Sequence, residues 1–124
     1  MDKKLSTIQK IEKINDVYAV GDVGPGGGYH EYRIVSIEDG KEPSTVLADI
    51  QFQRGPRGVN SSVKGVLDAD LLEIIRDRLK LFQEGEFETL YNDKALEHVE
   101  EALMWLNRRV EDRAERNVLG TYHK

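Results

Sequence analysis

Three arginines near the end of the chain have the spacing of one helical face. Arg109, Arg113 and Arg116 follow one another at i, i+4 and i+7. Each guanidinium presents a planar fork that matches the oxygens of a phosphate group. The same spacing also suits ion pairs with the acids at 111, 112 and 115, and cations are favourable near a helix C-terminus. Spacing alone leaves a phosphate site and a structural role equally open.

A second cationic element lies in the middle of the chain, where residues 50–66 read IQFQRGPRGVNSSVKGV. From residue 51 onward this stretch carries Arg54, Arg57, Lys64 and three glycines, with no acidic residue. Glycines let backbone N–H groups approach an anion closely, and arginine adds charge-assisted hydrogen bonds. The composition predicts a local anion-binding loop, with an ordinary surface connection as the alternative.

Three aromatic residues surround a predicted turn and could stack on a nucleobase. They are Phe82, Phe87 and Tyr91. The alternative is packing between two helices. We expect packing more strongly for Phe87 than for Phe82, which falls at the end of a predicted helix.

No residue pattern in the chain indicates catalysis or metal binding. The glycine run at 24–28 lacks the spacing of either standard phosphate loop. The three histidines, at 30, 98 and 123, have no metal-ligand spacing, and there is no cysteine. The sequence therefore predicts no catalytic residue, no metal site and no cofactor.

Chain length and net charge narrow the classes of protein to which this sequence could belong. At 124 residues we expect a single domain over 1–124, whose small core would benefit from oligomerisation. The net charge of -5 weighs against DNA binding, which requires a broad basic surface. No stretch approaches the ~18 apolar residues of a membrane helix, so we expect a cytosolic protein without a membrane partner.

The first half of the chain has the pattern of an antiparallel sheet. We predict strands at 17–23, 29–37 and 44–53, separated by turns at 24–28 and 38–43. The segment 5–14 is ambiguous, because its isoleucines have helical spacing while "ND" at 15–16 suits a turn between strands. We favour a strand there.

The second half has the pattern of two helices. Asp68 is the predicted cap of the first helix, and Gly85 ends it. A second helix is predicted over 93–118, with Gly120 ending it. The fold class is therefore α+β, with a small antiparallel β-sheet within a β-rich part at 6–53 and a two-helix antiparallel hairpin at 68–119. Apolar residues at 103–106 exceed what one partner helix can cover, which predicts a subunit interface.

Several ordered blocks carry a resemblance to known proteins. They are Gly58-Val59-Asn60, the helix at 71–83, Asn92, the segment 100–109, and Gly120-Thr121 followed by His123. This half of the chain resembles the C-terminal hairpin shared by two phage families, the Thoeris anti-defence sponges and the second anti-CBASS sponges. The β-rich part at 6–53 resembles the Thoeris family, whereas the turn at 85–92 departs from the family pattern by reading GEFETLYN.

The resemblance implies a non-enzymatic sponge in the host bacterial cytoplasm. Such proteins bind glyco-cyclic isomers of ADP-ribose, the signal made by bacterial TIR-domain defence proteins, and relatives also hold cyclic di- and trinucleotides. They form homodimers that can assemble into homohexamers, with the pocket between subunits. Alternatives are a sponge for the cyclic oligonucleotides of CBASS defence, an enzyme that degrades such signals, and a protein-interaction module without a ligand.

The resemblance also implies roles for individual residues. By matching position, Phe82 would stack on the adenine and Asn92 would lie against the same base. Arg57 and Arg109 would hold the phosphates, and Arg113 is a further ligand-binding candidate.

Overall fold

The computed structural model describes residues 2–38, 40 and 44–124. The chain forms two compact units, Met1–Gly65 and Val66–Lys124. The boundary coincides with the change from a glycine-rich, β-forming composition to a helical one. No helix in the described residues has the length and apolar composition that crossing a membrane requires.

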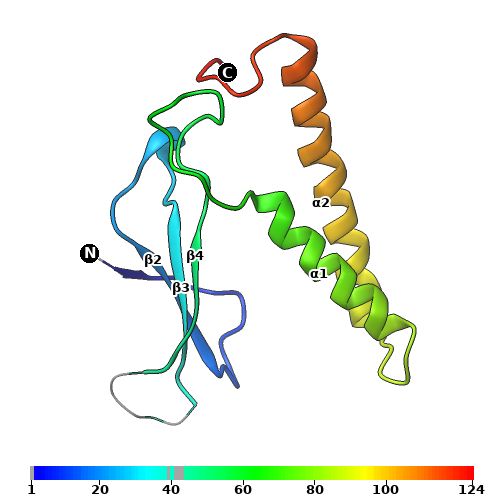
Figure 1. Cartoon of the computed structure of the whole chain (residues 1–124). Helices are drawn as coiled ribbons and strands as arrows, with labels where there is room; N and C mark the ends of the chain where they lie inside the picture. Colours follow the sequence, from blue (N-terminus) through cyan, green and yellow to red (C-terminus); the bar gives the residue numbers. More distant parts are fainter. Residues whose placement is uncertain (1, 39, 41–43) are drawn as a thin grey trace. The chain divides into compact units, whose positions relative to one another are not determined.

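The first unit is a four-stranded antiparallel sheet in the order β1-β2-β3-β4 (Figure 1). The strands are β1 (Lys3–Lys4), β2 (Asn15–Val20), β3 (Glu31–Ser36) and β4 (Val46–Gln51). Neighbouring strands are also neighbours in sequence, which confirms the predicted meander. The short η1 helix (Pro25–Gly27) lies in the predicted glycine turn between β2 and β3. Part of the other predicted turn, residues 39 and 41–43, lies outside the described residues.

The prediction of a strand over residues 5–14 is wrong. Only Lys3–Lys4 pairs with β2, and the pairing ends where the Leu5 N–H donates to the Val17 carbonyl at 2.8 Å. Beyond this point the side chain of Gln9 donates to the carbonyls of Ile11 and Glu12. These local bonds replace ladder bonds, and Glu12 adopts a positive φ of 57°. The segment is therefore a loop with exposed isoleucines.

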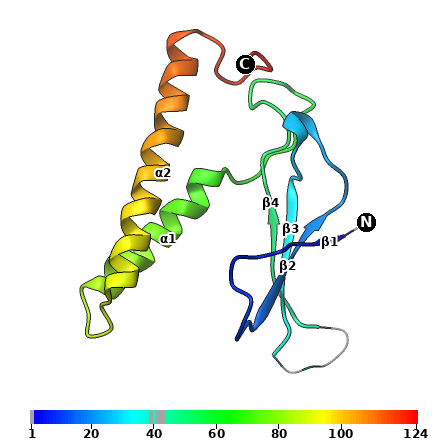
Figure 2. The same ribbon diagram turned by 180° about the vertical axis from the view of Figure 1, so that it is seen from behind.

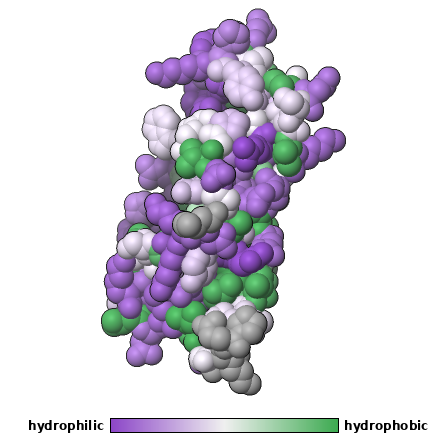
Figure 3. All heavy atoms as spheres, turned by 90° about the vertical axis from the view of Figure 1, so that its left-hand side faces the viewer, coloured by the Kyte–Doolittle hydropathy of each residue, from purple (hydrophilic) through white to green (hydrophobic). Residues whose placement is uncertain are grey.

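The sheet has a small buried core. Ala19 and Val35 are its buried apolar residues, and Tyr32 meets Phe52 edge to face with ring centroids 5.6 Å apart. Asp16 is also buried and pairs with two lysines on the first part of the chain. Hydrophobic side chains consequently reach the surface on the face displayed in Figure 3.

The second unit is a helical hairpin made of α1 (Asp68–Gln83) and α2 (Leu90–Glu115). The helices lie side by side and run in opposite directions (Figures 1 and 2). Sheet and hairpin together confirm the predicted α+β class. The cap predicted at Asp68 is displaced by one residue, because Leu67 occupies the N-cap position. The Asp70 carboxylate accepts from the Leu67 N–H at 2.9 Å and so takes over the capping role.

Helix α2 begins and ends earlier than predicted. Its N-cap is Thr89, whose hydroxyl accepts from the Asn92 N–H at 3.0 Å. At the other end Asn117 adopts a φ of 59°, and the Val118 N–H donates to the Arg113 carbonyl at 2.9 Å. This is a Schellman end in which asparagine takes the left-handed position. The prediction that Gly120 ends the helix is therefore wrong.

Candidate ligand-binding site

The loop end of the hairpin is fixed by one glutamine. Gln83 Nε2 donates to the Thr89 carbonyl at 2.9 Å and to Asp93 Oδ1 at 2.6 Å, while its Oε1 accepts from the Thr89 N–H at 3.1 Å. These bonds join the last residue of α1 to the first turn of α2. Phe82 precedes Gln83 in the sequence and Asn92 precedes Asp93, so these bonds hold Phe82 and Asn92 at the same end of the hairpin. Sequence reasoning missed Gln83, because this clamp is made with the backbone of Thr89 and with the Asp93 carboxylate ten residues away.

Phe82 presents part of its ring to the surface. It is 44% exposed, and the Arg78 guanidinium carbon lies 5.2 Å from the ring centroid. This distance is within the range of a cation–π contact. Phe87 is 77% exposed because it lies in the turn rather than between the helices. The expectation that Phe87 packs better than Phe82 is therefore wrong.

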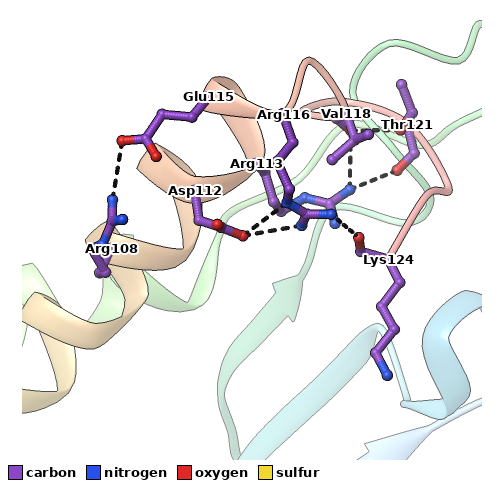
Figure 4. Close-up of polar contacts among 8 residues, drawn as sticks. All are labelled: Arg108, Asp112, Arg113, Glu115, Arg116, Val118, Thr121 and Lys124. Atoms are coloured by element: carbon purple, nitrogen blue, oxygen red, sulfur yellow. Dashed lines mark hydrogen bonds and ion pairs between the residues drawn. The ribbon is translucent and has the colours of Figure 1, made fainter.

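Arginines at the C-terminal end of α2 are mostly engaged by neighbouring groups, as Figure 4 shows. Arg108 pairs with Glu115 at 3.3 Å, and the hydrogen bond raises the pKa of this guanidinium. Arg116 pairs with Asp112 at 3.0 Å and donates to the Lys124 carbonyl at 2.8 Å. Arg116, one of the three arginines on the predicted face, therefore forms the ion pair that the structural alternative predicted.

The other two arginines of that face differ from one another. Arg113 is buried, with 8% exposure, and its Nη2 donates to the carbonyls of Val118 and Thr121. Arg109 is exposed and has no hydrogen-bond or ion-pair partner among the described residues. Its guanidinium therefore keeps its donors available for an anion.

Arg109 also lies on the wall of a groove within the second unit. The groove has a volume of about 750 Å³ and runs between the start of α1 and the second half of α2. Leu103, Leu106 and Val110 supply apolar lining. An ion pair between Arg76 and Glu100, with Nε and Oε2 2.8 Å apart, joins the two helices beside it. That hydrogen bond raises the pKa of the Arg76 guanidinium.

The two ends of the hairpin are far apart within one chain. Asn92 and Arg109 both belong to α2 and are 17 residues apart in sequence. At a rise of 1.5 Å per residue this corresponds to about 25 Å along the helix axis. One small molecule therefore does not contact both residues of a single hairpin.

Arg57 lies in the first unit, in the loop that follows β4. Arg54 and Val63 close this loop by exchanging two backbone hydrogen bonds, of 2.9 and 2.8 Å. The Ser62 hydroxyl donates to the Pro56 carbonyl at 2.7 Å and ties the loop internally. Arg57 is exposed in the turn at its tip and has no ion-pair partner in the described part of the chain. The loop can present its guanidinium to an anion.

Across the described ranges, 2–38, 40 and 44–124, no three histidine or acidic side chains gather as a metal site would require. Arg57 and Arg109 have open N–H donors, and guanidinium groups suit anionic oxygens.

Comparison with known proteins places this hairpin in a family. A family model described as "Acb2/Tad1, hairpin domain" matches residues 44–111, which is more than half of the chain. The chain belongs to the Acb2/Tad1 hairpin family. The family resemblance seen in the sequence is thereby confirmed. The matched segment contains Arg57, Phe82, Asn92 and Arg109, whereas Arg113 lies beyond it.

A relative within this group is "Thoeris anti-defense 1" from Bacillus phage SBSphiJ7. The two sequences are 42% identical over 78 residues, which cover 63% of this chain and 54% of the phage protein. The chain thus spans about half the length of this Acb2/Tad1-type relative.

Proposed function

We propose that the protein is a phage anti-defence protein that binds and sequesters a cyclic ADP-ribose-type signal, glyco-cyclic ADP-ribose, inside the host bacterium. In this way it would withhold the signal from the effector of Thoeris defence. The name of the phage relative supports the anti-defence role, and the open arginines support an anionic ligand.

One observation carries the assignment of the anion-binding group. Among the arginines at 108, 109, 113 and 116, in and directly after α2, Arg109 alone lacks a partner in the described residues, while the others are held by carboxylates or carbonyls. Exposed arginines readily form ion pairs, and α2 supplies acids at 111, 112 and 115. An arginine whose donors are unengaged can form charge-assisted hydrogen bonds with a phosphate brought by a ligand.

The base and the phosphates would be held by different subunits. Phe82 and Asn92 lie at one end of the hairpin and Arg109 toward the other, about 25 Å away along α2. We therefore propose a homodimer or homohexamer in which a ligand lies between subunits. Arg57 would add a second cation from its loop.

Sequestration without reaction is tested by recovering the ligand. Purified protein is incubated with glyco-cyclic ADP-ribose, separated from unbound ligand by gel filtration, and heat-denatured. We expect the released nucleotide to be chromatographically unchanged and stoichiometric with the sites. Release of linear products would show that the protein is an enzyme and not a sponge. Failure to retain any nucleotide would favour a protein-interaction module without a ligand. Retention of cyclic di- or trinucleotides in parallel incubations would assign the CBASS signals instead.

A further inference from the structure

The two helices of the hairpin begin with different versions of the same cap. At the start of α1, Asp70 is the third helical residue, and its Oδ2 accepts from the backbone N–H of the N-cap residue Leu67 at 2.9 Å. Asn92 occupies the same position in α2, and its backbone N–H donates to the Thr89 hydroxyl. The Asn92 side chain, in contrast, has no hydrogen-bond partner among the described residues. The reciprocal bond of a capping box is therefore made by Asp70 and not by Asn92.

The open amide of Asn92 is not explained by side-chain length. Asparagine and aspartate side chains are equally long, and Asp70 reaches the N-cap N–H of α1. The N-cap N–H of α2, on Thr89, is taken by Gln83, the last residue of α1, whose Oε1 accepts from it at 3.1 Å. Because this donor is occupied, Asn92 has no N-cap N–H to fold back on. Gln83 thus supplies from the other helix the bond that Asn92 would otherwise make.

Two further bonds hold the Gln83 amide in this arrangement. Its Nε2 donates to the Thr89 carbonyl at 2.9 Å and to Asp93 Oδ1 at 2.6 Å. The residue is also half-buried. With both ends of the amide engaged, the Gln83 acceptor stays on the Thr89 N–H.

We propose that Gln83 is a positioning residue that keeps the Asn92 amide free for the adenine of the ligand. This inference rests on the proposed function, in which Asn92 lies against the base. A free amide offers an N–H donor and a carbonyl acceptor side by side, which match the N7 acceptor and the N6 amino donor of adenine. Hypoxanthine matches the amide less well, because an oxygen replaces the amino donor. Gln83 therefore sets a preference for adenine without touching the ligand.

Removal of Gln83 should redirect Asn92 to its own helix. In a Gln83→Ala protein the Thr89 N–H loses its acceptor, and the amide oxygen of Asn92 can replace it, as the Asp70 carboxylate does at α1. Asn92 would then complete the capping box and turn away from a base. Removing Gln83 and removing Asn92 are therefore expected to cost the ligand the same interaction.

Thermal unfolding tests this competition without any ligand. In the wild-type background, Asn92→Ala should leave the melting temperature within error, because the amide has no partner to lose. In the Gln83→Ala background, the same substitution should lower the melting temperature by about 4 °C, which corresponds to the loss of a helix cap in a small domain. Equal effects of Asn92→Ala in the two backgrounds would overturn the inference.

Calorimetry with two ligands tests the consequence for binding. The probes are glyco-cyclic ADP-ribose and its analogue with hypoxanthine in place of adenine. We expect the wild type to bind the adenine ligand at least tenfold more tightly and the Gln83→Ala protein to retain less than about a threefold preference. Adding Asn92→Ala to Gln83→Ala should cause little further loss. An undiminished preference in a folded Gln83→Ala protein would contradict the positioning role.

Asp93→Ala is the matched control for a general loosening of this end of the hairpin. It removes the 2.6 Å bond to Gln83 Nε2 but leaves Oε1 on the Thr89 N–H. We expect lower stability with the adenine preference unchanged. If Asp93→Ala also abolished the preference, rigidity of the turn would explain it and the specific role of Gln83 would be refuted. A wild type that binds neither nucleotide would refute the sponge instead, and the unfolding experiment would still decide the competition at Thr89.

Discussion

Arg113 Nη2 lies 3.0 Å from the carbonyl oxygen of Thr121 and donates a hydrogen bond to it. The same nitrogen donates to the Val118 carbonyl at 3.1 Å, and the residue is buried. The arginine thus holds the segment that follows α2 against the helix end (Figure 4). Its position on the face shared with Arg109 does not make the two arginines equivalent, because only Arg109 has its donors unengaged.

We expect Arg113→Ala to destabilise the protein by about 2 kcal/mol, since two partly buried carbonyls lose the charged donor of a buried side chain. Thermal unfolding measures the loss, and hydrogen exchange should accelerate at the amides of 118–121. Arg116→Ala is the control, because that side chain is about half exposed and pairs at the surface. An unchanged melting temperature for Arg113→Ala with lost ligand binding would assign Arg113 to the ligand rather than to the tail.

Phe82→Ala should weaken nucleotide binding at least tenfold, or about 1.4 kcal/mol, which lies within the range of base stacking on aromatic rings. The fold should survive, because the ring is 44% exposed. Calorimetry and thermal unfolding on the same sample separate the two effects. Phe87→Ala removes a more exposed ring from the adjoining turn and should leave both quantities unchanged. Undiminished affinity in a folded Phe82→Ala protein would exclude stacking.

The order of the elements was predictable because hydrophobic period and turn residues are local signals. The antiparallel sheet and the two helices follow from alternation at 44–53 and from helical spacing along 96–110. The errors lie where side chains cap the backbone. Asp70 rather than Asp68 caps α1, Thr89 starts α2 and Asn117 ends it. Each position offered several capping residues, and only the folded geometry selects one of them.

The candidate site was predictable in part. Residue types and spacing predicted the face that carries Arg109, Arg113 and Arg116. Spacing could not tell which of these arginines is hydrogen-bonded within the chain. Arg113 and Arg109 differ because the chain after residue 116 turns back and offers carbonyls to one and not to the other. Such contacts depend on the left-handed Asn117, which no periodicity reveals. The distance between Asn92 and Arg109, in contrast, follows from their spacing of 17 residues on one helix, about 25 Å along its axis.

Gly65→Ala should destabilise the first unit by about 1–3 kcal/mol, as overpacking does. A Cβ at this position would lie under 3.0 Å from backbone atoms of Gln51 and Phe52, which cannot shift without disturbing β4. Thermal or urea unfolding measures the change. Gly28→Ala is the control, because it meets nothing within 4 Å and has an ordinary φ of -111°. Equal stability of the two variants would show that the segment before α1 can move away from the sheet.

Arg57→Ala should lower nucleotide affinity at least tenfold while leaving the melting temperature within error. The exposed side chain has no ion-pair partner among the described residues, so the fold loses little. Calorimetry over a range of salt concentrations measures the change. Lys64→Ala removes another exposed cation of the same loop and should have a smaller effect, since lysine lacks the bidentate fork. Equal losses for both variants would indicate general electrostatic attraction in place of a specific phosphate contact.

Arg109→Lys discriminates a phosphate fork from a simple positive charge. Lysine keeps the charge but loses the paired N–H donors, so we expect at least a tenfold loss of affinity, about 1.4 kcal/mol, with unchanged assembly and stability. Arg108→Lys is the matched control on the adjacent residue, whose guanidinium is already paired with Glu115. It should bind nucleotide as the wild type does. Calorimetry with glyco-cyclic ADP-ribose gives both affinities. If both variants bind as tightly as the wild type, the phosphates are held elsewhere, and Arg109 is open only because its neighbours have taken the available acids.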